Sequence, residues 1–198
     1  MDRRVFRVIS RLDMQSQKER SSKTKVARGQ EMLAITADTG MFFSILLKAI
    51  RARRVLEVGT SAGFSTLWLA DAVGKKGRII TIEMDLRKVE RARKNFKLAG
   101  VDRLIEVKQG VALDVLHTLN GKFDFVLLDA DKENIIEYFD LVLPLVRAGG
   151  IIAADNILFP PNYRPMMKKY TRHVQSRHNV QSVTVPIGMG EEITIKLA

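Results

Sequence analysis

The sequence predicts an α/β fold built on a doubly wound sheet of seven strands, mostly parallel, with an antiparallel C-terminal edge and additional N-terminal helices. From residue 54 onward, short apolar runs alternate with helical patterns, which is typical of parallel strands joined by right-handed helical crossovers. The last two strand-like runs flank a short turn around Gly188-Met189-Gly190. This spacing indicates an antiparallel pair at one edge of the sheet.

The individual elements follow from local patterns along the chain. Apolar spacing predicts helices over residues 2–18 and 27–50, before the first strand. Gly100 is placed to end a helix at its C′ position, and Pro144 interrupts a helix near its end. Pro160-Pro161 precede the last helix. The expected strands are residues 54–58, 78–83, 104–109, 123–128, 150–154, 181–186 and 192–196, and the later helices are residues 64–73, 86–99, 111–119, 133–147 and 163–177.

Length and composition favour one domain over residues 1–198, with residues 1–50 as a helical addition that covers the site or a partner subunit. The chain has no cysteine, which excludes a disulfide framework, a zinc-thiolate site and a cysteine nucleophile. No run of 18 apolar residues and no secretory signal are found in the sequence. We therefore expect a cytoplasmic protein without a membrane segment.

The formal net charge of +11 is high for a chain of this size. Nine Lys or Arg stand against three acids in residues 1–28, and six stand against one in residues 86–97. Such charge suits a polyanion such as RNA, or a phosphorylated substrate. A solvated surface is the simpler interpretation, because no nucleic-acid-binding motif and no pattern of arginines among aromatic residues accompanies the charge.

Acidic residues follow two runs that are typical of buried parallel strands. FDFVLLDADK brings Asp129 to the end of the run over residues 123–128, and GGIIAADN brings Asp155-Asn156 to the end of the next. Ligands bind at this edge of open α/β sheets. Two carboxylates and an amide oxygen suit Mg²⁺ or a similar divalent cation, although capping of the strand ends is the alternative. Lys132 lies on the same rim.

The first strand leads into a glycine turn and a helix, in RVLEVGTSAGFST. Gly59 and Gly63 allow a ligand to approach the backbone, although they could instead serve only the tight turn. Glu83 ends the next strand, where an acid reaches ribose hydroxyls. Because the motif lacks the G-x-G-x-x-G spacing of dehydrogenases, it favours a nucleoside without phosphates.

Together these segments resemble the cation-dependent O-methyltransferases of the caffeoyl-CoA and catechol type, within the Rossmann-like S-adenosylmethionine methyltransferases. The resemblance covers about residues 30–198. It is carried by VLEVGTSAGFSTLWLA, IITIEMD, LAGV, VKQGVALDVL, LLDADKEN and GGIIAADNILF. The pairing of DADK with DN at this spacing is its most specific feature.

The resemblance implies a role for each matching residue. It implies S-adenosylmethionine as the methyl donor and Mg²⁺ or another divalent cation as a second cofactor. It also implies a homodimer, which the apolar face of residues 27–50 favours as well. The implied metal ligands are Asp129, Asp155 and Asn156, and the implied catalytic residues are Lys132, as general base, and Asp129. The implied cofactor-binding residues are Ile35, Glu57, Gly59, Thr60, Ser65, Glu83, Gly110, Val111, Ala112, Asp129 and Asp131.

The methyl acceptor stays open at this stage. Gly188-Met189-Gly190 stands where the family often has Gly-Asp-Gly, and the loop ILFPPNYRP after Asn156 is short. Phe159 and Tyr163 on this loop could stack on an aromatic acceptor or only fill the loop. A catechol-like small molecule is the expected acceptor. The alternatives are a hydroxylated uridine in tRNA, or a non-catalytic module that binds the cofactor or RNA.

Overall fold

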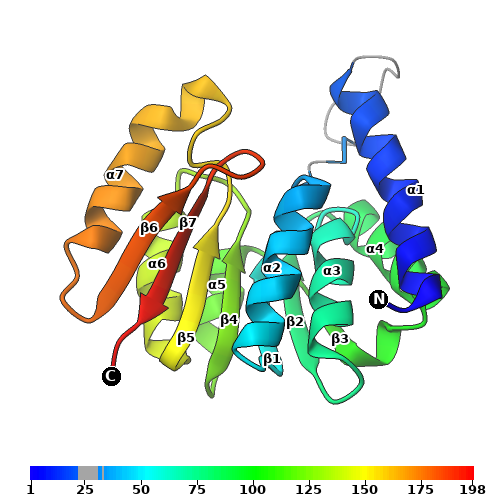
Figure 1. Ribbon diagram of the computed structural model, residues 1–198, viewed down its shortest axis with the longest axis horizontal. Helices are drawn as coiled ribbons and strands as arrows, with labels where there is room; N and C mark the ends of the chain where they lie inside the picture. The colour runs from blue at the N-terminus through cyan, green and yellow to red at the C-terminus, as the bar shows by residue number, and fades with distance from the viewer. Residues whose placement is uncertain (22–30, 33) are drawn as a thin grey trace.

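The computed structural model describes residues 1–21, 31–32 and 34–198 and shows a seven-stranded sheet between helices (Figure 1). The strand order is β3-β2-β1-β4-β5-β7-β6, in which β7 pairs antiparallel with β5 and β6 and the other pairs are parallel. The predicted fold is therefore confirmed. The strands are β1 (Arg54–Val58), β2 (Arg78–Glu83), β3 (Ile105–Gln109), β4 (Phe123–Leu128), β5 (Val146–Ala154), β6 (Val180–Val185) and β7 (Glu191–Lys196).

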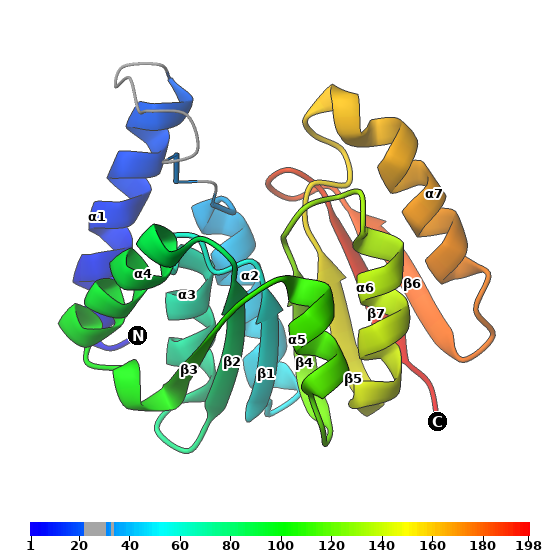
Figure 2. The same ribbon diagram turned by 180° about the vertical axis from the view of Figure 1, so that it is seen from behind.

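The helices divide between the two faces of the sheet, and each group buries its own apolar core. One core joins one face of the sheet to α1 (Arg3–Arg20), α2 (Ala37–Ala49), α3 (Phe64–Val73) and α4 (Leu86–Ala99). The other joins the opposite face to α5 (Ala112–Thr118), α6 (Ile135–Val142) and α7 (Arg164–Gln175), as the view from behind shows (Figure 2). Alternate strand residues supply the two cores because successive side chains point to opposite faces.

The expected helix over residues 27–50 is wrong at its start. The helix α2 begins at Ala37, and residues 34–36 are not helical; residues 22–30 and 33 lie outside the described residues. Thr36 caps the helix, because its Oγ1 accepts a hydrogen bond from the backbone nitrogen of Thr39 over 3.2 Å. The cap fixes the start of α2 at the level of the strand ends, where the candidate site lies.

The expected helix over residues 133–147 is also too long. The helix α6 ends at Val142, a short 3₁₀ turn spans Leu143–Leu145, and β5 begins at Val146 instead of residue 150. Pro144 cannot continue an α-helix. Val146 instead pairs with Phe123 of β4, before a register shift in the ladder. The last residues of this longer strand, 151–154, lead to Asp155 at the edge of the sheet where the candidate site lies.

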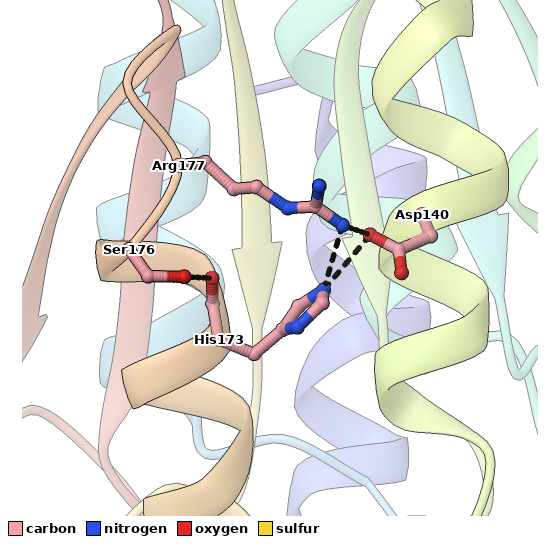
Figure 3. A network of polar contacts seen from close by, with 4 residues as sticks. All are labelled: Asp140, His173, Ser176 and Arg177. Carbon is pink, nitrogen blue, oxygen red and sulfur yellow. Dashed lines mark hydrogen bonds and ion pairs between the residues drawn. The ribbon is translucent and has the colours of Figure 1, made fainter.

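A polar network holds α7 against α6 (Figure 3). Asp140 of α6 accepts a hydrogen bond from Arg177 over 2.6 Å and contacts the Nε2 atom of His173 at 2.9 Å. The ring of His173 also meets Phe139 edge-on. This contact steadies the helix that follows the loop after Asn156.

None of the helices among the described residues is long and apolar enough to cross a membrane.

Candidate active site

The register of the sheet brings one row of residues to the ends of five neighbouring strands. Val58 pairs with Ile82 and Leu128, Leu128 pairs with Ala154, and Ala154 pairs with Glu192. Leu127 and Ala153 pack on the face of the sheet that α2 and α3 cover. Because side chains two residues apart lie on the same face, the residues that directly follow Leu128 and Ala154 lie on this face as well. The row reads, from β2 to β7, Glu83, Gly59, Asp129, Asp155 and Glu191.

Gly59 separates the two acidic parts of this row. Its φ of +103° is unfavourable for other residues, and a Cβ there would collide with the backbone carbonyl of Asp129. The ends of β1 and β4 therefore approach each other closely. Beside this point, Glu83 receives hydrogen bonds from the backbone nitrogens of Ser61 at 2.9 Å and Asp85 at 3.0 Å. Each carboxylate oxygen of Glu83 has further acceptor capacity, which suits a vicinal diol.

Glu57 lies one level deeper, on the same face of β1. Its side chain is fully buried, and its Oε2 accepts hydrogen bonds from the hydroxyls of Thr66 and Thr81, both at 2.5 Å. Burial raises the pKa of Glu57 to about 7, although the nearby hydroxyls of Ser65, Thr66 and Thr81 oppose the shift. Its Oε1 is buried without a hydrogen-bond partner within the described part of the chain. That oxygen is free to accept a bond from a ligand above it.

Asp129 and Lys132 form an ion pair on the other side of Gly59. Their Oδ1 and Nζ atoms are 3.2 Å apart, and Lys132 is only 3% exposed. Burial raises the pKa of Asp129 to about 7; Lys132 lowers it, and the neighbouring Asp155 raises it further. The ammonium group is thus held in place by a carboxylate that lies beside two more acids, Asp155 and Glu57.

The loops around Asp155 close this side of the row. Asn156, at a φ of 69°, turns the chain out of β5, in a conformation that asparagine tolerates better than most residues. The backbone nitrogens of the next residues, Ile157 and Leu158, donate to the carbonyls of Gly190 and Met189 over 2.9 and 3.0 Å. The β6–β7 turn therefore fixes the loop that follows two of the predicted metal ligands, Asp155 and Asn156.

The acids of the predicted metal site fit a hard cation in their chemistry. Asp155 is 2% exposed, and its Oδ1 lies among the described residues without a hydrogen-bond partner. An oxygen-bound divalent cation would satisfy such an atom, and Asp129 and Asn156 offer further oxygens of the kind it prefers. No cluster of three or more His, Cys, Asp or Glu arranged to hold a metal is found in residues 1–21, 31–32 and 34–198, so the predicted set depends on the amide of Asn156.

Sequence reasoning missed Glu191, the first residue of β7. It is fully buried, and its Oε1 accepts a hydrogen bond from Thr39 of α2 over 3.2 Å. Burial, followed by the contact with Asp155 and the charge of Asp129, raises the pKa of Glu191 to about 11. The doublet of acids after Gly190 was a usable signal, because one of two successive strand residues must face each side of the sheet.

The other predicted cofactor residues are spread around the row. Thr60 and Ser65 are buried beside Glu57, and the backbone nitrogen of Gly110 donates to the carbonyl of Glu83 over 3.0 Å. Val111 is half exposed next to Gly110 and Ala112. Two others are less directly placed. Ile35 is buried in the core with α1 to α3, and Asp131 is exposed while Tyr138 and Asn134 hold its carboxylate.

The sequence of this chain is similar to those of known O-methyltransferases. The O-methyltransferase family matches residues 9–195. A catechol O-methyltransferase of Mycobacterium tuberculosis (strain ATCC 25618 / H37Rv) is 47% identical over 127 residues, 64% of this chain and 58% of that protein. A caffeoyl-CoA O-methyltransferase of Medicago sativa is 34% identical over 154 residues, 72% of this chain and 62% of that protein. The chain thus spans about three fifths of the length of these curated relatives.

A solved structure extends the likeness over the whole chain. The O-methyltransferase TomG of Streptomyces achromogenes, involved in tomaymycin synthesis and solved in complex with SAM, is 28% identical and has a TM-score of 0.80. The match covers 100% of this chain and 91% of that one. The fold is that of the class I methyltransferases. The chain belongs to the O-methyltransferase family.

Proposed function

We propose that this protein is an S-adenosylmethionine-dependent O-methyltransferase that uses a divalent cation and methylates a hydroxyl of a catechol-like small molecule. The observation that carries the proposal is the row of acids at the strand ends, which Gly59 divides into two parts. Glu83 lies on one side, with Glu57 beneath Gly59, and Asp129 with Lys132 and Asp155 lies on the other. In this proposal, the residues on one side of Gly59 would bind the cofactor and those on the other side would bind the acceptor.

On the cofactor side, Glu83 would accept hydrogen bonds from the two ribose hydroxyls, because its position and free acceptor capacity suit a diol. The unpartnered Oε1 of Glu57 would accept from the α-amino group of the methionine part. When bound, S-adenosylmethionine supplies a methyl group on a sulfonium. The closely packed ends of β1 and β4 at Gly59 would hold the donor against the acceptor side.

On the acceptor side, Asp129, Asp155 and Asn156 would hold the divalent cation, which when bound orients a hydroxyl and lowers its pKa. In its neutral amine form, which a bound cation would favour by repelling the ammonium charge, Lys132 would receive the hydroxyl proton at Nζ as the oxygen attacks the methyl carbon and displaces the sulfur. Asp129 would fix the position of that nitrogen. Positioning of the two reactants is itself a large part of such catalysis. Phe159 is half exposed on the loop that follows these ligands and would stack on an aromatic acceptor.

The basic surface supports a second candidate, in which the acceptor is a hydroxylated uridine of tRNA. The helices α1 and α4 lie side by side (Figure 1), and both are rich in Lys and Arg. A cationic surface of this kind would attract an RNA backbone. The exposed basic residues on these two helices include Arg3, Arg4, Arg7, Arg11, Lys18, Arg87, Lys94 and Lys97.

The experiment that decides is methyl transfer from labelled S-adenosylmethionine by the purified protein. The acceptors are a panel of catechols and total tRNA, each with Mg²⁺ and with excess chelator. We expect label on a catechol with Mg²⁺ and none with chelator. Label on tRNA alone would establish the second candidate, and transfer that survives excess chelator would refute cation dependence. If neither acceptor is labelled, a non-catalytic cofactor- or RNA-binding module becomes the better account.

A further inference from the structure

We propose that the starts of strands β1, β2 and β3 form a second binding site, which takes the phosphate group of a small organic phosphate. These parallel strands begin at one edge of the sheet and end at the candidate active site. The two sites are about 16 Å apart along β1, a strand of five residues. None of the residues of the second site belongs to the cofactor side or the acceptor side of the proposed function, so either site can fail without the other.

The second site is a pocket of about 550 Å³. Three arginines line it: Arg54 at the start of β1, Arg78 at the start of β2 and Arg103 in the short turn before β3. Ile80 and Leu104 add apolar surface beside them. Sites for small molecules have volumes of about 300–1,000 Å³ and combine apolar walls with a few polar groups. The pocket therefore has the size and the lining of a small-molecule site.

The register of the sheet brings two of these arginines together. Arg54 pairs directly with Arg78 across the β1–β2 ladder. Leu56 and Ile80, two residues further along, pack on the core that α5, α6 and α7 cover, so both arginines lie on that face. None of the described helices lies in front of the starts of β2 and β3 in the view from behind (Figure 2). Like charges that face each other on neighbouring strands are destabilising, and an anion between them would relieve the repulsion.

The guanidinium groups of the three arginines are not neutralised by the protein. None of them forms an ion pair with a carboxylate in the described part of the chain. The Cζ atom of Arg54 lies 5.4 Å from the centre of the Phe123 ring, and a Cβ on Gly121 would lie 3.0 Å from its Nη1 atom. Arg78 donates a hydrogen bond to the carbonyl of Gly77 over 2.8 Å. Neutral neighbours thus position these groups and leave their charge available to a ligand.

The charge and shape of these groups favour a phosphate monoester. Glu106 also lines the pocket, but Lys108 pairs with it over 2.8 Å. A guanidinium donates two parallel hydrogen bonds to the oxygens of a phosphate. A phosphate monoester carries about 1.5 to 2 negative charges at neutral pH, whereas a carboxylate carries one. The apolar side chains beside the arginines would contact the organic part, and the limited volume favours a small molecule over an RNA backbone.

The test is an NMR titration of the ¹⁵N-labelled, cofactor-free protein with phenyl phosphate, in the absence of divalent cations. We expect saturable shifts of the backbone amides of Arg54, Arg78 and Arg103. Arg78→Gln and Arg103→Gln, both at exposed positions, should each raise the dissociation constant about 10-fold or more, the usual loss for a hydrogen bond to a charged group. Arg53→Gln is the matched control, because it removes the same charge beside the pocket without belonging to its lining, and it should bind like the wild type.

The spectra show that each variant folds, and two further probes separate the parts of the ligand. Inorganic phosphate should bind more weakly than phenyl phosphate, and benzyl alcohol should leave the three arginine amides unshifted. Shifts that do not saturate, or an equal loss of affinity in Arg53→Gln, would refute the site and show only a diffuse attraction of anions. Tighter binding of a single-stranded RNA oligonucleotide at the same amides would overturn the choice of a small phosphate.

Discussion

Replacing Glu57 with glutamine should change how the stability of the cofactor-free protein depends on pH. Glu57 is fully buried, and its pKa is raised from 4.5 to about 7. The native state therefore holds a proton at this site more tightly than the unfolded state does. Between about pH 4.5 and 7 the native state binds more protons, so the contribution of Glu57 lowers stability as the pH rises through this window.

The magnitude follows from the size of the shift. One pKa unit corresponds to about 1.4 kcal/mol, so the shift of Glu57 corresponds to at most about 3 kcal/mol across the window. Glu57→Gln removes the titrating group but keeps an oxygen that can accept from Thr66 and Thr81. The free energy of unfolding of the variant, minus that of the wild type, should therefore increase by up to about 3 kcal/mol from pH 4.5 to pH 7.5.

Urea denaturation of both proteins at several pH values, without cofactor and with chelator, measures this difference. Taking the difference between the proteins removes the constant cost of the substitution and most of the contribution of other groups. Glu90→Gln, at an exposed position of α4, is the matched control and should leave the pH profile unchanged. Parallel profiles for Glu57→Gln and the wild type would show that Glu57 does not titrate near neutral pH.

Three further predictions concern the cofactor, the base and the assembly. Glu83→Ala should weaken S-adenosylmethionine binding by about 1–3 kcal/mol, because ribose hydroxyls lose their acceptor; an unchanged dissociation constant in calorimetry would remove Glu83 from the cofactor site. Lys132→Ala should lower the turnover number by about 10² to 10⁴-fold with little change in cofactor affinity, and Lys132→Arg should not rescue it, since a guanidinium stays protonated. Methyl transfer that persists in Lys132→Ala would show that Lys132 is not the general base. The exposed Met41 and Ile45 on α2 favour a homodimer, and a monomer mass by light scattering at micromolar concentration would argue against it.

The fold was largely predictable because apolar runs mark the strands in the sequence and a glycine marks a helix end. The apolar runs around Glu57 and before Glu83 and Asp129, and the glycine after α4, each gave the right element. One of the two errors fell at a local helix cap, and the other where tertiary strand pairing decides. Apolar residues around 27–36 suggested a longer helix, but Thr36 caps α2. Pro144 indicates only where a helix stops, and it does not indicate that the next residues pair with β4, as Val146 does.

The site was predictable only where a motif marks a strand end. Asp129 and Asp155 follow apolar runs, so their positions could be inferred from the sequence, and the structure brings them into one row. Glu191 required the register of an antiparallel pair, which the sequence alone did not specify, since a shift of one residue would turn Glu192 to the site instead. The engagement of Asp131 by Tyr138 likewise depends on a contact seven residues away that no motif indicates.

The central claim is that one row of acids serves the cofactor on one side of Gly59 and a cation on the other. A crystal structure of the protein with S-adenosylhomocysteine and Mn²⁺, with the ion located by its anomalous scattering, tests this claim most directly. We predict an anomalous peak bound by Asp129 and Asp155, and ribose hydroxyls bonded to the carboxylate of Glu83. A peak elsewhere in the molecule, or an adenosine that does not reach Glu83, would contradict the account.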